Sequence, residues 1–467
     1  MTSNQDFSAP DWVADAIFYQ IFPDRFCNGD PRNDPPVLSA WGDLPTRDNF
    51  FGGDLQGILD RLDYLQDLGV NALYLNPIFQ AQTNHRYDTS DYFQVDAALG
   101  DIALLKQLVA QFHQRGVRVI LDGVFNHCGD GFAPFQDALK NGASSSYANW
   151  FLPRSYPLQK EPLNYLTCGG CSYLPKLNLA HRPVQEFILS VARYWLKETG
   201  MDGWRLDVPF KIPFSFWREF RQAVKSINPQ AYLVGEVWRE AGPWIQGDVF
   251  DGTTNYRLRD LALDYVLTNV LDGEDFAFEV DMLLSGHKQA AHSMLNLLDS
   301  HDTARILTSL KGEEALLRIA MTIQMTLPGA PMIYYGDEVG LLGENDPDCR
   351  RCMPWDESKW NRSIYTMTRG LVTLRKSHPA FRYGHPHKLA TFNGIYAYRQ
   401  ASEGDEGIVI LNPRENVSAM AIPTASRITL WQEFFSQQIY PAVEGLIHFD
   451  QIPAHSALIL LPLETTA

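Results

Sequence analysis

Short runs of apolar residues alternate along most of the chain with longer segments of helical periodicity. Repeated βα units give this pattern, because each buried strand is followed by an amphipathic helix that covers the sheet. Two of the expected helices, at 55–68 and 104–115, are followed directly by glycines, which suits a helix C-cap. The apolar runs predict eight strands, at residues 16–22, 71–76, 117–124, 203–208, 232–237, around 253, 295–299 and 332–335.

Two stretches break this alternation. Residues 126–180, after the third expected strand, show little regular periodicity and predict a small inserted domain. After residue 377 the pattern changes to short alternating strands with Gly, Pro and Asn turns, which predicts an antiparallel β-sandwich. We therefore expect an α/β protein: a (β/α)8 TIM barrel formed by residues 1–125 and 181–378, an inserted domain at 126–180, and a C-terminal β-sandwich at 379–467.

Composition and charge narrow the range of partners. The chain has 467 residues, of which 45% are hydrophobic and 20% charged, as in a globular protein of more than one domain. Its net charge of −16 argues against nucleic acid or an anionic membrane as a partner, because phosphate binding needs a basic surface. The first residues lack the features of a secretory signal, and no apolar run reaches the roughly 18 residues that cross a bilayer. We therefore expect a cytoplasmic protein.

Polar residues gather where four of the expected strands end, in segments 122–127, 203–207, 235–238 and 298–302. The carboxyl ends of barrel strands carry the chemistry of such folds. Retaining glycosidases need two carboxyl groups about 5–5.5 Å apart, and Asp207 and Glu236 end adjacent strands, where that spacing is natural. Arg205 points to the same side as Asp207, and its charge would keep that carboxylate ionised. This arrangement predicts Asp207 as the nucleophile and Glu236 as the general acid/base.

These four segments, in this order, resemble the conserved regions of glycoside hydrolase family 13, the α-amylase family. The resemblance implies a third catalytic carboxylate, Asp302, and two histidines, His127 and His301, that bind sugar hydroxyls. Tyr87 matches the tyrosine on which this family stacks its sugar, since an aromatic face complements the C–H face of glucose. Arg205 belongs to the same group of substrate-binding residues.

Three further segments, 19–26, 174–178 and 346–353, are similar to the neopullulanase, cyclomaltodextrinase and maltogenic amylase branch of the family. By this match Asp346 and Arg350 contact glucose on the non-reducing side of the scissile bond, and Trp238 walls the acceptor side. Fifteen residues precede the first expected strand, where the branch usually carries an extra domain. Residues 208–211 read Val-Pro-Phe-Lys, whereas the branch tends to have Val-Ala-Asn-Glu. Both departures predict a more open acceptor side.

The expected function is that of a retaining hydrolase of α-glucans such as pullulan, branched maltooligosaccharides or starch-like chains. It would cleave α-1,6 bonds, as a debranching or neopullulanase-like enzyme, or α-1,4 bonds, through a covalent glucosyl-enzyme intermediate. A cyclomaltodextrinase, a maltogenic amylase or a glucanotransferase shares these catalytic residues and stays an alternative. A non-catalytic binding module is a distant alternative, because Asp207, Glu236 and Asp302 are all kept. The sequence leaves monomer and homodimer open.

One loop has the composition of a calcium site. Residues 28–34 bring several Asn and Asp oxygens onto a loop bent by Gly and Pro, and such hard donors suit Ca²⁺. With 52–54 the loop resembles a structural calcium site of this branch, whose ligands would be Asn28, Asp30, Asn33, Asp34, Gly52 and Asp54. The alternative is an Asn/Asp-rich turn without an ion.

Two cysteine pairs, Cys168 with Cys171 and Cys349 with Cys352, have spacings that also occur in zinc sites. The pairs are far apart in the sequence, so a shared metal would need the fold to bring them together. We expect free thiols instead, as in a reducing compartment, and no organic cofactor.

Overall fold

Eight parallel strands form a closed barrel in the computed structural model, which describes residues 8–463. Their order is β8-β7-β6-β5-β2-β1-β10-β9, and a parallel bridge between Thr254 and Leu295 joins the two outer strands. All eight expected strands are present, and the predicted fold class is confirmed. Their bounds are β1 (Phe18–Ile21), β2 (Ala72–Leu75), β5 (Arg118–Gly123), β6 (Gly203–Leu206), β7 (Tyr232–Gly235), β8 (Gly252–Thr253), β9 (Leu295–Leu297) and β10 (Ala330–Tyr334).

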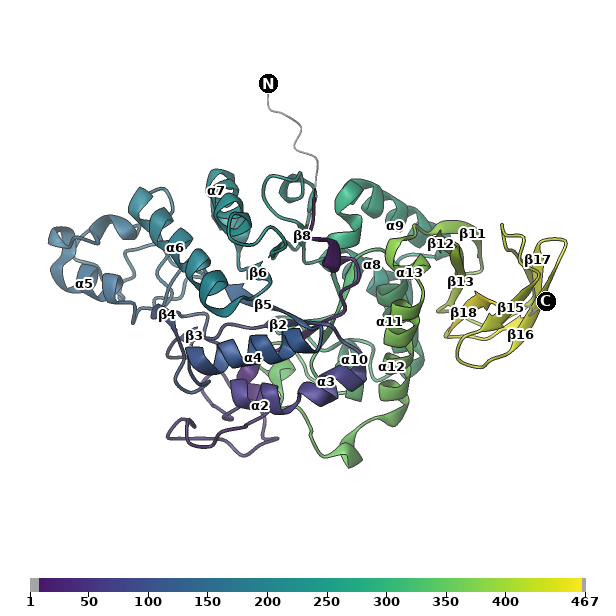
Figure 1. Cartoon of the computed structure of the whole chain (residues 1–467), viewed down its shortest axis with the longest axis horizontal. Helices are drawn as coiled ribbons and strands as arrows, with labels where there is room; N and C mark the ends of the chain where they lie inside the picture. Colours follow the sequence, from purple (N-terminus) through teal and green to yellow (C-terminus); the bar gives the residue numbers. More distant parts are fainter. Residues whose placement is uncertain (1–7, 464–467) are drawn as a thin grey trace, which may run out of the picture.

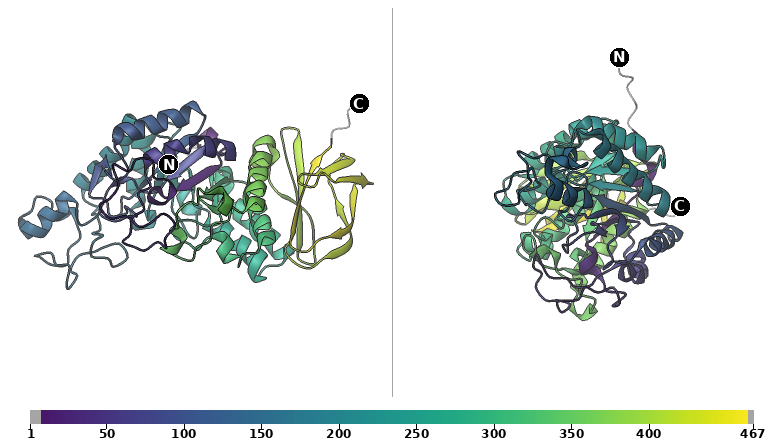
Figure 2. Two further views of the ribbon diagram at one scale, coloured as in Figure 1. Left: turned by 90° about the horizontal axis from the view of Figure 1, so that it is seen from below. Right: turned by 90° about the vertical axis from the view of Figure 1, so that its left-hand side faces the viewer.

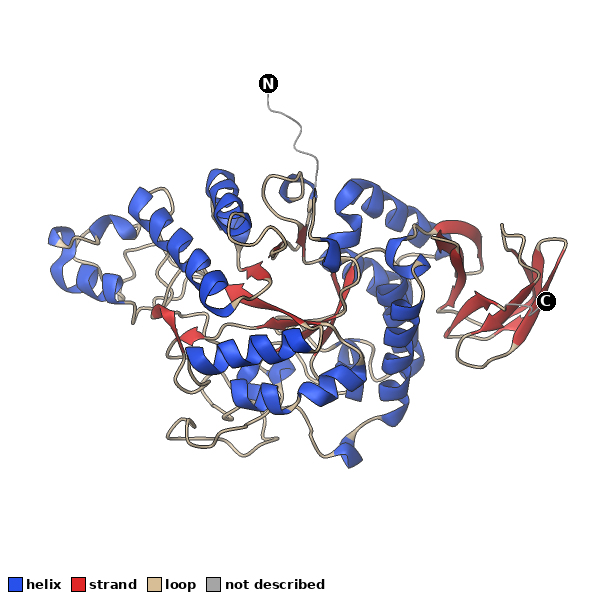
Figure 3. Ribbon diagram, viewed as in Figure 1, coloured by secondary structure: helices blue, strands red, loops and turns tan. Residues whose placement is uncertain are grey.

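Helices surround this barrel, as Figures 1 and 3 show. The expected helix at 55–68 is interrupted at Arg61, and Gly69 ends its second half in the left-handed conformation that suits glycine. The expected helix at 104–115 starts earlier, after Asp101, whose side chain accepts a hydrogen bond from the Leu104 N–H. The main helices are α2 (Leu55–Asp60), α3 (Leu62–Leu68), α4 (Ile102–Gln114), α6 (Arg182–Thr199), α7 (Phe214–Lys225), α8 (Tyr256–Leu263), α9 (Gly273–His287), α11 (Glu314–Thr326) and α12 (Arg362–Ser377).

Alternation along the strands separates the barrel interior from the layer under the helices. On β1, Phe18 packs with the interior cluster, whereas Tyr19 and Ile21 pack in the larger cluster with the helices. Gln20 shares the inward side with Phe18 and is fully buried. A polar side chain at such a position needs hydrogen-bond partners, and these partners belong to the site described below.

The chain between β5 and α6 leaves the barrel. It holds α5 (Ala133–Asn141), two short 3₁₀ turns and a hairpin in which Thr167 pairs with Pro175. Further upstream, β3 (Phe79–Gln80) and β4 (Asp91–Val95) form a two-stranded ribbon. Figures 1 and 2 show α5 at one end of the molecule and the C-terminal strands at the other end.

The C-terminal strands form one antiparallel sheet in the order β11-β12-β13-β18-β15-β16-β17-β14, folded around its own core. Figure 3 shows these strands together at one end of the molecule. Ile395, Val417, Trp431 and Ile447 come from different strands and meet in this core, as expected of a sandwich. The strands are β11 (His387–Phe392), β12 (Ile395–Ser402), β13 (Asp405–Asn412), β14 (Val417–Pro423), β15 (Leu430–Glu433), β16 (Ile439–Val443), β17 (Leu446–Ile452) and β18 (Ser456–Pro462). No helix within residues 8–463 is long and apolar enough to cross a membrane.

A buried arginine on α12 ties the last part of the barrel together. Arg375 is fully buried and donates to the backbone carbonyls of Met325 and Phe381 at 2.7 Å, and to that of Gly329. These carbonyls belong to the end of α11, to α13 (Ala380–Tyr383) and to the turn before β10. The guanidinium thus donates to buried backbone carbonyls of three different segments.

Arg375→Met should destabilise the fold without affecting the chemistry. The variant keeps the apolar stem but leaves at least three buried carbonyls unpaired, and each unpaired group costs roughly 1–3 kcal/mol. We expect a lower midpoint of thermal unfolding and an unchanged kcat at low temperature. Arg369→Met is the matched control, because Arg369 lies exposed on the same helix. Equal melting temperatures for the two variants would contradict this account.

Candidate active site

One buried guanidinium holds three carboxyl groups at the carboxyl ends of β5, β6 and β7. Arg205 Nη1 lies 2.9 Å from Oδ1 of Asp122 and 2.9 Å from Oδ1 of Asp207, and its Nη2 lies 3.2 Å from Oε2 of Glu236. The parallel register pairs Asp122 with Arg205 directly. Sequence neighbours in three βα units therefore become contacts around one positive charge.

Asp207 presents one carboxylate oxygen that has no partner. Its Oδ1 bonds Arg205, whereas Oδ2 is buried and accepts no hydrogen bond. Burial raises the pKa of Asp207 well above its usual value; Arg205 opposes this shift, and the nearby carboxyl of Glu236 adds to it. The geometry leaves Oδ2 as the unpartnered atom of this carboxyl group.

Glu236 is fixed by donors on both of its oxygens. Its Oε1 accepts from Nε1 of Trp238 at 2.9 Å, and its Oε2 accepts from the Val208 N–H at 3.0 Å. Val208 has a φ of 44°, a left-handed conformation that is costly for a β-branched residue. This backbone strain, directly after Asp207, aims the Val208 N–H at the second carboxyl. Trp238 itself stacks on Tyr256, with ring centroids 3.7 Å apart.

Tyr87, His301 and Asp302 form a second group of predicted site residues that contact one another. His301 stacks on Tyr87, with ring centroids 5.5 Å apart and nearly parallel planes. Its Nε2 lies 3.3 Å from Oδ2 of Asp302, which is 30% exposed. His127 is buried, its Nε2 has no partner, and burial lowers its pKa to about 4, so it is neutral at pH 7.

Arg350 extends this arrangement away from the carboxyl pair. It donates through Nε to the His301 carbonyl at 2.9 Å, and its Nη groups lie 2.9 Å from Asp346 and 3.5 Å from Asp302. A cavity of about 420 Å³ opens beside this ion pair, and it is lined by Arg47, Asp48, Gln82, Thr83, His85, Asp88, Tyr173, Asp346 and Arg350. The two residues expected on the non-reducing side thus border a cavity next to Asp302.

Four polar residues of this network were not identified from the sequence. Asp122 accepts hydrogen bonds from the hydroxyls of Tyr74 and Tyr87 at 2.6 and 2.8 Å, besides its contact with Arg205. Asn76 donates to Tyr87 at 3.1 Å, and Gln20 contacts Asn76 and His301. A usable signal exists: three of them, Gln20, Tyr74 and Asp122, are polar side chains within otherwise apolar strands.

The loop expected to bind calcium is folded around Asp54, the N-cap of α2. The carboxylate accepts from the backbone N–H groups of Gly29 at 3.0 Å and Asp30 at 2.8 Å, and from the side-chain amide of Asn33 at 3.1 Å. Asn28 donates to Asp34 at 2.7 Å, while Asp30 pairs with Arg32. The Oδ1 atoms of Asn28 and Asn33 are buried without a partner. A Cβ on Gly52 would lie 2.5 Å from Asp34, so only glycine fits there.

The six cysteines are not in disulfides. Cys168 and Cys171 lie at a hairpin tip, where the Cys171 N–H donates to the Cys168 carbonyl at 3.0 Å. Cys349 and Cys352 are buried, and Cys349 Sγ donates to the His301 carbonyl at 3.2 Å. Within residues 8–463, neither cysteine pair belongs to a group of three or more His, Cys, Asp or Glu side chains that could hold a metal such as zinc.

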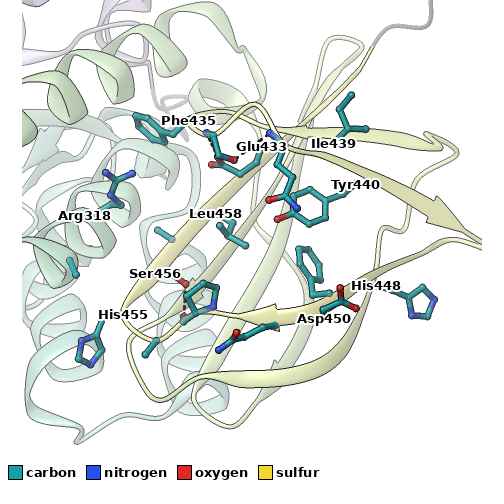
Figure 4. A pocket seen from close by; sticks show the side chains of 18 of the residues that line it. Arg318, Glu433, Phe435, Ile439, Tyr440, His448, Asp450, His455, Ser456 and Leu458 are labelled. Atoms are coloured by element: carbon teal, nitrogen blue, oxygen red, sulfur yellow. Dashed lines mark hydrogen bonds between the residues drawn. The ribbon is translucent and has the colours of Figure 1, made fainter.

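A cavity larger than the one beside Arg350 lies away from the candidate active site. A cavity of about 910 Å³ lies between α11 and the C-terminal sheet, lined among others by Arg318, Tyr440, His448 and His455 (Figure 4). None of the residues around Arg205 contributes to it. The candidate active site therefore rests on its charge arrangement and not on volume.

Known proteins resemble the chain over most of its length. Residues 20–384 match the catalytic domain of the α-amylase family. Cyclomaltodextrinase of Geobacillus thermopakistaniensis (strain MAS1) is 48% identical over 417 residues, which are 88% of this chain and 71% of that protein.

Two solved structures match nearly the whole fold. The cyclic α-maltosyl-(1→6)-maltose hydrolase of Arthrobacter globiformis, in complex with that sugar, superposes with a TM-score of 0.89 at 43% identity, covering 97% of this chain and 100% of that one. The debranching enzyme of Nostoc punctiforme gives 0.88 at 38% identity, covering 98% and 100%. These matches confirm the family that the strand-end motifs predict, and the chain belongs to the α-amylase family.

Proposed function

We propose that this protein hydrolyses α-glucans with retention of configuration. Asp207 Oδ2 attacks the anomeric carbon while Glu236 gives its proton to the departing glycosidic oxygen, which leaves a glucosyl ester on Asp207. Glu236 then takes a proton from water, and that water breaks the ester and restores both carboxyl groups. The observation that carries this proposal is the placement of Asp207 and Glu236 on one guanidinium, with Asp207 Oδ2 unpartnered.

Arg205 has a defined task in this scheme. Three carboxyl groups share its single positive charge, so one additional proton within the cluster lowers the electrostatic energy. In the proposed scheme Asp207, which bonds Arg205 at 2.9 Å, acts as the carboxylate, and Glu236 supplies the proton to the leaving group. In this scheme Asp302 binds the hydroxyls of the reacting sugar; its partial exposure and its position next to Arg350 support that role.

We propose that the enzyme cleaves α-1,6 bonds in branched or pullulan-like glucans, and α-1,4 bonds as well. The support comes from relatives that match this chain end to end: one hydrolyses cyclic α-maltosyl-(1→6)-maltose and one is a debranching enzyme. Phe210 and Trp238, which follow the two carboxyl residues closely in the chain, are 55% and 39% exposed and offer apolar faces to an acceptor sugar. Cyclodextrin hydrolysis is the second candidate, favoured by the cyclomaltodextrinase at 48% identity.

We further propose a structural Ca²⁺ in the loop at 28–34. The buried, unpartnered Oδ1 atoms of Asn28 and Asn33 fit an oxygen-ligated cation, and the carboxylates of Asp34 and Asp54 adjoin them. Asp30 and the Gly52 carbonyl would complete the set. An ion there would join this loop to the start of α2 and take no part in the chemistry.

A cytoplasmic location is proposed on different grounds. Six cysteines without a disulfide suit a reducing compartment.

Replacing the two carboxyls separates their roles. Asp207→Asn should lower kcat on maltooligosaccharides on the order of 10⁴-fold or more, because the amide is no nucleophile. Glu236→Gln should be comparably slow on glucans, yet retain much of its rate on an aryl α-maltoside whose leaving group needs no proton. Asp63→Asn, on an exposed helical site, serves as the matched control and should keep full activity. An Asp207→Asn enzyme with near-normal turnover would contradict the assignment.

Substrate preference is measured by kcat/KM on pullulan, a branched maltooligosaccharide and β-cyclodextrin. We expect the values for the first two to be at least equal to that for β-cyclodextrin, since the acceptor side presents the exposed Phe210 and Lys211. Lys211→Glu restores the acidic residue common in the branch and should shift the ratio toward cyclodextrin. A strong cyclodextrin preference in the unmodified enzyme, with negligible α-1,6 cleavage, would rule out the linkage proposal.

Removal of calcium should affect stability more than rate. A ligand at a hundred times its Kd stabilises the folded state by about 2.7 kcal/mol, so chelation should lower the melting temperature and leave kcat at low temperature nearly unchanged. Asp34→Ala should abolish the dependence on calcium, whereas Asp43→Ala, in the same excursion of the chain, should keep it. Identical melting curves with calcium and with chelator would count against the ion.

A further inference from the structure

Gln20 is a buried amide in the barrel interior that the proposed chemistry does not use. It is fully buried on β1, and its Nε2 lies 2.8 Å from Nδ1 of His301 and 3.0 Å from Oδ1 of Asn76. His301 and Gln20 are 281 residues apart in the chain. The orientation of this amide decides which nitrogen of His301 carries the proton.

The proton positions follow from Arg205 outward. Asp122 bonds the Arg205 guanidinium and is therefore a carboxylate that only accepts hydrogen bonds. The hydroxyls of Tyr74 and Tyr87 lie 2.6 and 2.8 Å from its Oδ2, so both of them donate to it. Each tyrosyl oxygen is then left as an acceptor toward its other neighbours.

Asn76 is oriented by these two oxygens. Its side chain contacts the Tyr87 oxygen at 3.1 Å and the Tyr74 oxygen at 3.4 Å, and both need a donor. The NH₂ group must therefore face the tyrosines, and Oδ1 must face Gln20. Because Oδ1 accepts, Gln20 has to present its own NH₂ group on that side, and the same nitrogen faces Nδ1 of His301.

His301 completes the sequence. Burial, together with the positive charges of Arg350 and Arg205, lowers its pKa well below the usual value, so the ring is neutral and carries one proton. Nδ1 accepts from Gln20, so the proton sits on Nε2, next to the Tyr87 oxygen and 3.3 Å from Asp302. The charged and titratable groups around the ring are Tyr87, His85, Asp302, Arg350 and Arg205.

We propose that Gln20 is a positioning residue that holds His301 in its neutral Nε2–H form, with that N–H at the Tyr87 oxygen and beside Asp302. The part that concerns the tautomer stands on the contacts alone. The part that concerns catalysis rests on the proposed function, in which His301 and Asp302 bind sugar hydroxyls. A neutral donor beside Asp302 supplies a hydrogen bond without adding a charge to the carboxyl cluster.

The tautomer is measured directly by NMR of the intact enzyme with ¹⁵N-labelled histidine. The signals of His301 are identified by their loss in a His301→Asn sample. We expect Nε2 protonated and Nδ1 unprotonated across the neutral pH range. A proton on Nδ1 in the unmodified protein would overturn the proposal, whatever the enzyme's activity.

Two variants of Gln20 should differ in how their activity depends on pH. Gln20→Leu removes the donor to Nδ1, and we expect kcat/KM to fall about tenfold at every pH, since one buried hydrogen bond is lost. Gln20→Glu places a carboxylate against Nδ1, which raises the pKa of His301 and draws a proton to Nδ1. Its Nε2 then keeps a proton only in the imidazolium form, so activity should decline as pH rises through that pKa. The unmodified enzyme should lack this step.

Gln324→Leu is the matched control. Gln324 is another buried glutamine of the barrel, and its Nε2 donates to the Asn296 and Met332 carbonyls at 3.1 and 2.8 Å, away from His301. It should match Gln20→Leu in stability loss but keep kcat/KM. If both leucine variants lose the same fraction of kcat/KM, and the pH profile of Gln20→Glu matches that of the unmodified enzyme, then Gln20 has only a structural role. If Gln20→Glu does not fold, the NMR spectrum and the two leucine variants still decide the matter.

Discussion

A single buried positive charge organises this site. Arg205 lies between carboxyl groups of three neighbouring strands, and none of the three could stay ionised there without it, because an unpaired buried carboxylate is strongly disfavoured. The same charge keeps Asp122 an acceptor, and through the two tyrosines it sets the amides and the tautomer of His301. The ion pair of Arg205 with Asp122 thereby sets the proton positions along the hydrogen bonds that lead to His301.

The barrel supplies the rigidity that this arrangement needs. Parallel strands in fixed register place residues of separate βα units within hydrogen-bond distance of one another. Other site residues lie on the loops that follow the strands. Backbone strain also serves the site: Val208 takes a left-handed conformation, and its N–H reaches Glu236. Asp346 and Arg350 come from a loop after β10, and Arg350 anchors that loop to the His301 carbonyl.

Sequence patterns located the elements well but not their ends or breaks. The segment at 55–68 has uninterrupted helical periodicity, yet the structure divides it at Arg61, whose guanidinium lies 4.0 Å from the ring centre of Trp355. That contact comes from a residue far along the chain, which no local pattern contains. Several strands are likewise shorter than the apolar runs; Asn76, for example, lies just beyond β2 and its side chain joins the site.

By itself the sequence determined the barrel, the family and the placement of Asp207, Glu236 and Asp302 at strand ends. The spacing of hydrophobic residues indicates which segments are strands and which are helices, and the order of the motifs indicates which strand each motif ends. The sequence could not determine the hydrogen-bond partners inside the barrel. Whether Gln20 contacts His301, and with which end of its amide, depends on how eight strands close and on where protons settle among buried groups. Only the tertiary structure decides this, since the energy of a buried polar group is set by all its neighbours at once.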